Sequence, residues 1–275
     1  MPTGDVNPGN TGPMKDGCNG NPQLTDRVSV NWLKFDVDRC QTSDVCEWIS
    51  EHAGQKAVIA NHNLHSIYLV NAEPDLRNFY ETSDLILADG FPIWLLIAIR
   101  TKVGNFSKRK FERIGSTDWI LSRGFGKLGM TIALVGASKE SNMAAIRRLQ
   151  VLHPSNRYVG WDGYAELEEL RREDYSTLRR SGASLVLVGL GMPLQEKFIA
   201  AEWDNLPPAI YATVGGALDQ LSGSQSLCPR WLGRIGAEWL WRLFSDPRRL
   251  AFRYLAEPVL LIVVLVKRAM SGGGL

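Results

Sequence analysis

The sequence has 275 residues, of which 45% are hydrophobic and 22% charged, and its formal net charge is +2. This composition is typical of a folded globular protein, and the near-neutral charge excludes a general polyanion-binding protein of the histone type, so we expect no nucleic acid partner. Four cysteines without a CxxC pair exclude a disulfide scaffold and argue against a zinc ribbon.

The first 26 residues differ in composition from the rest of the chain. Residues 1–26 are rich in Gly, Pro and Asn and contain no apolar segment. Such a segment cannot bury enough surface to order itself and is not a secretory signal, so it predicts a disordered tail.

Strand and helix patterns then alternate along the chain. Alternating or buried apolar runs predict strands at residues 28–37, 57–61, 84–88, 130–135, 157–161, 184–188 and 210–214. A phase slip at Trp32–Leu33 indicates a bulge or turn within the first of them. Helical patterns fall at residues 42–52, 64–70, from 92 onward, 139–152, 163–180 and 194–203. This order predicts an α/β domain at 27–224, with a Rossmann-like, mainly parallel sheet covered by helices on both faces.

The loops after several of these strands have unusual sequences. Right-handed crossovers place the carboxyl ends of parallel strands on one edge of the sheet, and α/β proteins bind ligands in a crevice there. We therefore expect a ligand site to be formed by loops 61–65, 89–90, 136–138, 189–195 and 215–216.

Three of these loops carry groups that could act on a sugar nucleotide. Asp89 follows an apolar strand, where desolvation favours a general base, although spacing alone favours an N-cap of the next helix. Gly136 lies between a strand and a helix and could admit a phosphate to the helix N-terminus, or could simply form a tight turn. Gln195 follows the turn at Gly191 and can donate to and accept from sugar hydroxyls; the alternative is a solvated helix start.

Two short patterns could be read as metal sites. Asp36-Val37-Asp38 matches the DxD pattern that holds a divalent ion on nucleotide sugars, but it lies within an alternating strand. His62 and His65 are spaced as possible ligands, but no third ligand is evident nearby, which favours polar loop and helix-start residues. We therefore expect no metal site.

Residues 225–275 combine basic and aromatic side chains. They contain eight Lys or Arg against three acidic residues, and three of the nine tryptophans. The apolar run 258–266 would be about 14 Å long as a helix, less than half of the ~30 Å hydrocarbon core of a bilayer. We expect a helical appendage that binds the membrane surface, or alternatively a basic amphipathic helix packed on its own domain. Arg242, Arg249 and Arg253 could project together if its helices pack end to end.

Taken together, these motifs resemble the bacterial WecG/TagA/CpsF glycosyltransferases over residues 28–256. The matching segments are NHNLH near 61, LILADG near 85, FERIGSTD near 111, LVGAS near 134, WDGY near 161, LVGLGMPLQEK near 187, TVGGALD near 213 and AEWLWRLFSDPRRLAFRY near 237. The resemblance implies an inverting, metal-independent hexosyltransferase that needs no cofactor. Its donor would be a UDP-sugar of N-acetylmannosamine or glucose type, and its acceptor a saccharide on undecaprenyl diphosphate at the cytoplasmic face of the inner membrane.

The resemblance also implies roles for individual residues. Asp89 matches the proposed general base, and Arg113 and Gln195 match pocket residues important for activity. Asn61 and Asn63 belong to the matching substrate loop, and Tyr164 and Asp219 fall where the uridine is held. The C-terminal arginines match an appendage that closes over the site.

Two positions depart from the family pattern. Asn61 replaces the usual threonine, and Leu227-Cys228-Pro229 replaces Arg-Ala-Pro, so the missing cation would have to come from Arg230, Arg242, Arg249 or Arg253. The alternative function is that of an inactive UDP-binding scaffold in a polysaccharide assembly complex. For the oligomeric state, a homo-oligomer is one of the alternatives. A nicotinamide-dependent enzyme is set aside because no GxGxxG follows the first strand.

Overall fold

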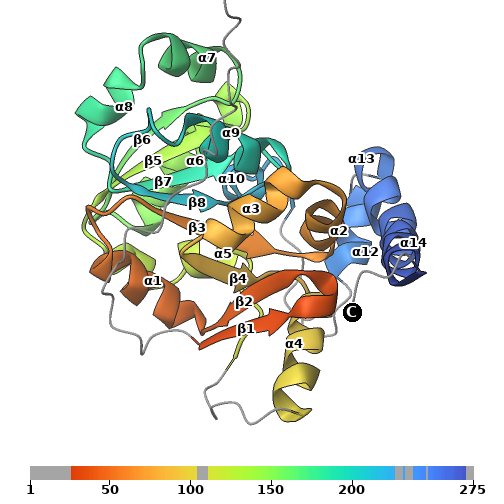
Figure 1. The fold of residues 1–275 in the computed structure, drawn as a ribbon. Coiled ribbons are helices and arrows are strands. Elements are labelled where there is room, and N and C mark those ends of the chain that lie inside the picture. The colour runs from red at the N-terminus through yellow and green to blue at the C-terminus, as the bar shows by residue number, and fades with distance from the viewer. Residues whose placement is uncertain (1–25, 104–110, 227–231, 233–237, 246, 271–275) are drawn as a thin grey trace, which may run out of the picture.

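A six-stranded parallel sheet forms the centre of the computed structural model, which describes residues 26–103, 111–226, 232, 238–245 and 247–270 (Figure 1). Its strand order is β4-β3-β8-β7-β5-β6. The strands are β3 (Ala57–His62), β4 (Leu85–Ala88), β5 (Thr131–Gly136), β6 (Arg157–Trp161), β7 (Leu185–Gly189) and β8 (Ile210–Thr213). Every pairing is parallel, which confirms the predicted α/β class. The predicted tail lies outside the described residues, except that the first strand already begins at Asp26.

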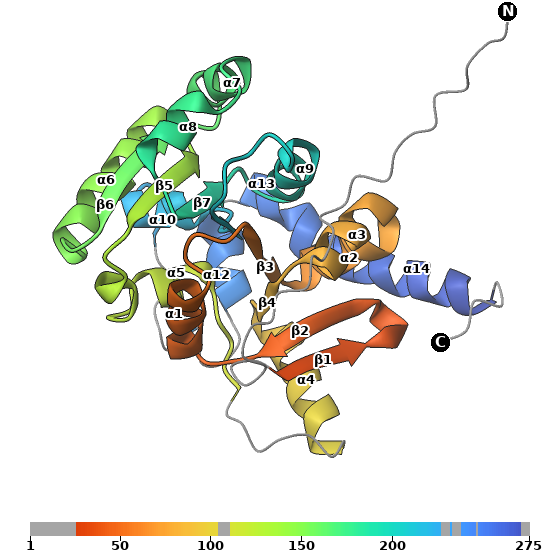
Figure 2. The same cartoon turned by 60° about the vertical axis from the view of Figure 1, so that its left-hand side comes forward.

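Helices cover both faces of this sheet, as predicted (Figure 2). Successive strand residues point to opposite faces, so Ile132 and Leu134 enter one apolar layer, and Ala133 and Val135 the other. The first layer is covered by α1 (Thr42–Glu51), α5 (Ser116–Ile120), α6 (Lys139–Leu152) and α10 (Ala217–Ser222). The second is covered by α3 (Pro74–Thr82), α7 (Ala165–Arg172), α8 (Ser176–Ser181) and α9 (Leu194–Glu202). A 3₁₀ turn, η2 (Phe125–Lys127), connects α5 to β5.

The alternating segment 28–37 forms a separate antiparallel hairpin. Strands β1 (Asp26–Val30) and β2 (Phe35–Arg39) flank a 3₁₀ turn at Asn31–Leu33, which confirms a turn at the phase slip. Their apolar side chains share a third cluster with α2 (Leu64–Ala72) and α4 (Phe91–Val103).

The second aspartate of the DxD pattern, Asp38, has a structural role in this hairpin. Asp38 is 2% exposed, forms an ion pair with Arg27 at 2.8 Å, and its Oδ2 accepts the Ile86 N–H at 2.8 Å. Asp38 thereby joins the hairpin to β4.

Helix boundaries differ from the sequence prediction in three places. The segment 163–180 contains two helices, because Asp174 and Tyr175 adopt positive φ angles between them. Helix α3 was not predicted, since its sequence is largely polar. Helix α1 ends at Glu51, one residue before the predicted end, and His52 is its C-cap.

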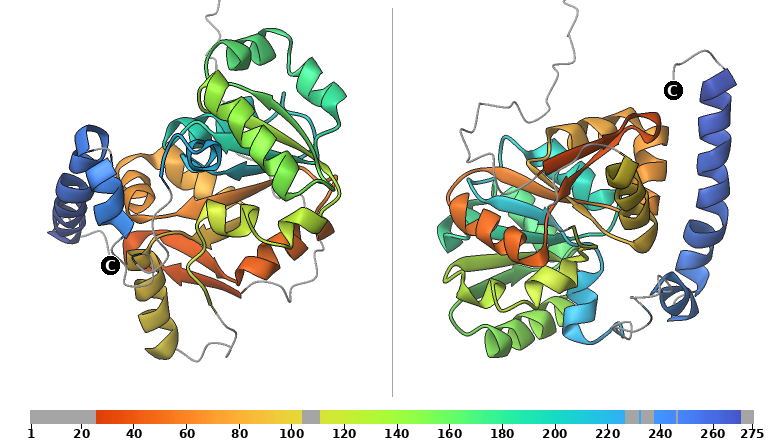
Figure 3. Two further views of the ribbon diagram at one scale, coloured as in Figure 1. Left: turned by 180° about the vertical axis from the view of Figure 1, so that it is seen from behind. Right: turned by 90° about the horizontal axis from the view of Figure 1, so that it is seen from below.

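The C-terminal part is helical, as predicted. It comprises α12 (Glu238–Ser245), α13 (Pro247–Ala251), a π-helical turn η3 (Phe252–Ala256) and α14 (Glu257–Met270). Helix α14 runs along the core beside α2 (Figure 3), and Leu261 is buried in the third apolar cluster. In the stretches that the structure describes, no helix combines the length and apolar character needed to cross a membrane.

Candidate functional site

A pocket of about 1600 Å³ opens at the carboxyl edge of the sheet. The loops after β3, β4, β7 and β8 line it, together with the segment before α5 and residues of the C-terminal helices. Four of the five predicted loops therefore meet in one place, and the exception is the loop at 136–138. Within the pocket the structure brings together Asp89, Arg113, Gln195, Asn61, Asn63, Gly191 and Arg253.

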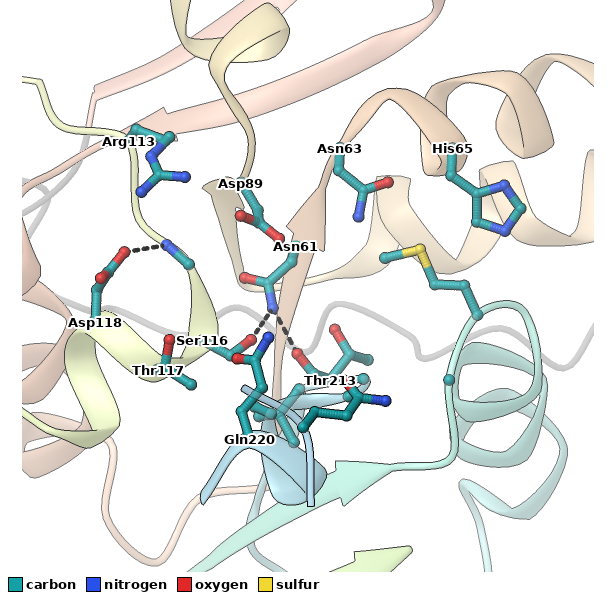
Figure 4. A pocket seen from close by; sticks show the side chains of 18 of the residues that line it. Asn61, Asn63, His65, Asp89, Arg113, Ser116, Thr117, Asp118, Thr213 and Gln220 are labelled. Atoms are coloured by element: carbon teal, nitrogen blue, oxygen red, sulfur yellow. Dashed lines mark hydrogen bonds between the residues drawn. The ribbon is translucent and has the colours of Figure 1, made fainter. Parts of the chain in front are cut away.

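Asp89 and Arg113 approach the pocket from adjacent backbone segments. The Asp89 N–H donates to the His62 carbonyl at 2.8 Å, and the Ile114 N–H donates to the Ala88 carbonyl at 2.9 Å, which holds Arg113 beside the end of β4. A Cβ atom on Gly115 would lie 3.4 Å from Asp89 Oδ1, so the carboxylate lies directly beside the Gly115 backbone. Figure 4 shows both side chains in the same pocket. Helix α4 begins at Phe91 with Gly90 directly before it, so Asp89 is not at the N-cap position that spacing favoured.

Asn61 is held in one orientation by its amide nitrogen. Nδ2 donates to Ser116 Oγ at 3.0 Å and to the Thr213 carbonyl at 2.6 Å (Figure 4). A backbone carbonyl can only accept, so the nitrogen must face Thr213. Oδ1 is buried and accepts no hydrogen bond from any described residue. An unsatisfied acceptor in a pocket wall is a group that a hydroxyl donor of a ligand would satisfy.

Gln195 is buried, so the interpretation as a solvated helix start is wrong for it and for Glu196. Each is 1% exposed. Gln195 Oε1 accepts the Gly215 N–H at 2.9 Å, and Nε2 donates to Glu196 Oε1 at 2.9 Å. Burial raises the pKa of Glu196 to about 7. Glu196 was not predicted as a site residue, because a glutamate in a first helical turn is usually solvated.

The two histidines of the 61–65 loop, His62 and His65, do not face one another as ligands of one metal ion would. His62 is fully buried, its Nδ1 lies 2.9 Å from Ser66 Oγ, and burial lowers its pKa to about 3. His65 Nδ1 instead lies 2.6 Å from Glu257 Oε2. Among the described residues, no three His, Cys, Asp or Glu side chains cluster as a metal site would require.

The C-terminal helices form one wall of the pocket and contact the 61–65 loop directly. Arg253 Nη2 donates to Asn63 Oδ1 at 3.3 Å, and the same oxygen accepts the Ser66 N–H at the start of α2. Glu257 is 5% exposed and pairs with His65. The side chains of Arg242 and Arg249, and all of Arg230, lie outside the described residues.

Gly136, Tyr164 and Asp219 lie at a neighbouring corner of the sheet edge and do not line this pocket. A Cβ atom on Gly136 would lie 2.4 Å from the Gly189 carbonyl oxygen, so glycine is required there by the close approach of two backbones. Tyr164 is 71% exposed at the start of α7. Asp219 lies half-buried in the first turn of α10.

One protein-family model matches most of the chain. The model described as "Glycosyl transferase WecG/TagA/CpsF family" matches residues 30–273. The match covers nearly the whole chain, including both the sheet and the C-terminal helices.

Proposed function

Because the chain belongs to the glycosyl transferase WecG/TagA/CpsF family, we propose that it moves a hexose-type sugar from a UDP donor to a lipid-linked saccharide during polysaccharide biosynthesis. The donor sugar is of N-acetylmannosamine or glucose type, and the acceptor is carried on undecaprenyl diphosphate. The observation that carries the proposal is the meeting of Asp89, Arg113, Asn61 and Gln195 in one pocket at the carboxyl edge of the sheet.

Asp89 is the general base in this proposal. Its carboxylate takes the proton from an acceptor hydroxyl, whose oxygen forms a bond to the anomeric carbon of the donor. The bond from that carbon to the β-phosphate oxygen breaks on the opposite face, so UDP leaves and the configuration inverts. Asn61 Oδ1, the buried acceptor without a described partner, takes a sugar hydroxyl.

Cations stabilise the charge that develops on the departing UDP, and no metal is needed. Arg113 lines the pocket beside Asp89, and Arg253 reaches it from the C-terminal wall. A guanidinium binds phosphate oxygens with charge-assisted hydrogen bonds, which strengthen as the leaving group gains charge. The corner with Gly136, Tyr164 and Asp219 is proposed to hold the nucleoside, with Asp219 accepting from ribose or uracil.

The outer face of α14 and of the turn before it supports binding to the cytoplasmic face of the inner membrane. Leu255, Val259, Ile262 and Val266 lie at helical spacing and are 51–61% exposed, whereas Leu261 on the opposite side is buried. An exposed apolar stripe in a basic segment matches an anionic lipid surface, where each basic residue contributes about 1 kcal/mol. Helix α14 begins at the pocket wall with Glu257.

The test is a UDP-release assay with a panel of UDP-sugars and a short-chain lipid diphosphate acceptor. We expect release with one sugar class, unchanged by EDTA. Asp89→Asn should retain UDP binding by calorimetry and lower kcat by about 10²–10⁴-fold, the usual contribution of a general base. Turnover of Asp89→Asn near the wild-type rate would refute the base. UDP binding without turnover of any donor would favour the inactive scaffold.

A further inference from the structure

Glu196 is a buried acid beside the pocket that the mechanism above does not use. It is 1% exposed, its Oε1 accepts Gln195 Nε2 at 2.9 Å, and the Tyr80 hydroxyl lies 3.4 Å from the same oxygen. Its Oε2 is buried and has no hydrogen-bond partner among the described residues. A buried carboxyl with an unsatisfied oxygen destabilises the fold, so its presence beside the pocket calls for a functional explanation.

The neighbours of Glu196 determine which way the Gln195 amide points. An amide side chain can be turned by 180°, which exchanges its donor and its acceptor. In the structure, the Gly215 N–H requires an acceptor at one end, and the Glu196 carboxylate requires a donor at the other. Nε2 has two hydrogens, and the bond to Glu196 uses one, so the second is available to a ligand. Without an acceptor at residue 196, only the bond to Gly215 would hold this orientation.

The same carboxyl is connected to the 61–65 loop. The Tyr80 hydroxyl also lies 3.2 Å from the Asn61 carbonyl, and the Tyr80 ring stacks on His62 with centroids 4.0 Å apart. Glu196 therefore contacts both Gln195 and the tyrosine that supports the backbone of Asn61.

We propose that Glu196 is a positioning residue, whose carboxylate orients the Gln195 amide toward the ligand and, through it, the Gly215 loop. The proposal rests on the proposed function for its catalytic consequence, but the orientation itself is a property of the protein alone.

The charge of Glu196 changes close to neutral pH. Burial raises its pKa to about 7, while hydrogen bonds from Gln195 and Tyr80 and the nearby Arg253 favour the ionised form. Three titratable groups around it keep their charge in this range, because His62 and His65 have pKa values lowered to about 3 and about 4, and that of Tyr80 is raised. A pH-dependent change at Gln195 near pH 7 is therefore assigned to Glu196.

The first experiment needs no substrate. The full chain is labelled with ¹⁵N-glycine, and the Gly215 amide resonance is followed from pH 5.5 to 8.5. We expect it to titrate with a midpoint near 7 in the wild type and to remain flat in Glu196→Gln, because the amide is isosteric but cannot ionise. A Gly215 resonance that is flat in the wild type, or that titrates equally in the variant, would overturn the proposal.

The second experiment tests whether the effect on turnover passes through Gln195. At pH 8, Glu196→Gln exchanges the charged acceptor of the Gln195 Nε2 hydrogen bond for a neutral amide oxygen, which should lower kcat/KM by about tenfold. In a Gln195→Ala background the same substitution should change kcat/KM by less than about threefold, because the group it positions is gone. An equal effect in both backgrounds would show a general structural role and overturn the proposal.

A matched control lies on the same helix. Glu202→Gln makes the same chemical change in α9, at a side chain that pairs with Arg171 at 3.4 Å and does not line the pocket. It should leave both the Gly215 titration and kcat/KM unchanged. If no UDP-sugar is turned over, the proposed function fails, while the Gly215 titration still decides whether Glu196 orients Gln195.

Discussion

Replacing Asn61 by aspartate should make the protein less stable as pH rises, which is opposite to the usual effect of a carboxyl group. Asn61 Nδ2 faces the Thr213 carbonyl at 2.6 Å, in a side chain that is 4% exposed. In Asn61→Asp an oxygen takes the place of that nitrogen and faces the carbonyl oxygen. Two acceptors at this distance repel unless the introduced carboxyl keeps its proton and donates it, so its pKa in the folded state must rise.

The size of the effect can be worked out from proton linkage. When folding raises the pKa of a carboxyl, the free energy of unfolding is unaffected by its titration at pH values below the unfolded pKa. As pH rises above the unfolded pKa, the free energy of unfolding falls progressively. With an unfolded pKa near 3.9, the cost of holding the proton grows by about 1.4 kcal/mol per pH unit, up to about 4 kcal/mol at pH 7. Between pH 5 and pH 7 the gap to the wild type should widen by about 2.7 kcal/mol.

The assay is urea unfolding monitored by tryptophan fluorescence at pH 5, 6 and 7. Asn63→Asp is the matched control, since it makes the same change two residues away. Asn63 Oδ1 caps α2 by accepting the Ser66 N–H and also accepts from Arg253, and a carboxylate can do both. Its stability should change by less than about 1 kcal/mol at each pH. Equal losses in the two variants, or a loss in Asn61→Asp that does not grow with pH, would refute the reasoning.

Two further predictions concern the hairpin and the C-terminal helix. Asp38→Asn should lower the free energy of unfolding by about 3 kcal/mol, the low end for a buried ion pair, because Arg27 loses its charged partner and keeps only the Ser83 and Asp84 carbonyls as acceptors. Asp36→Asn should have little effect on stability. Equal losses of metal-dependent turnover in both variants would instead restore the DxD interpretation. Val259→Asp combined with Ile262→Asp should weaken sedimentation with anionic vesicles at least about tenfold without changing the unfolding curve. Val151→Asp, at an 81% exposed site on α6, is the control, and equal sedimentation of both variants would remove α14 from the membrane contact.

Much of the fold could be predicted because its signals are local. Buried runs such as Ile132–Val135 and Leu185–Val188 identify parallel strands without any knowledge of their neighbours. Helix α3 was missed because its amphipathic pattern is short and mostly polar, and burial of Leu76, Phe79 and Tyr80 in the folded protein stabilises it. The break at Tyr175 was missed because a buried side chain, and not a glycine or proline, occupies the turn.

The candidate site also has a part that the sequence predicts and a part that it does not. The expectation that the strand-end loops meet at one edge depends on strand direction alone, and it brought Asp89, Asn61 and Gln195 to one pocket. Strand order could not be predicted, and it decides that the loop at Gly136 lies at a neighbouring corner.

By itself, then, the sequence determined the α/β class, the edge at which polar loops gather and the basic helical end, since each depends on residues close together in the chain. Only the tertiary structure decided that Glu196 is buried against Gln195 and that Glu257 pairs with His65. The second of these contacts joins residues on different elements, and the burial that shifts the pKa of Glu196 comes from side chains that are distant in sequence.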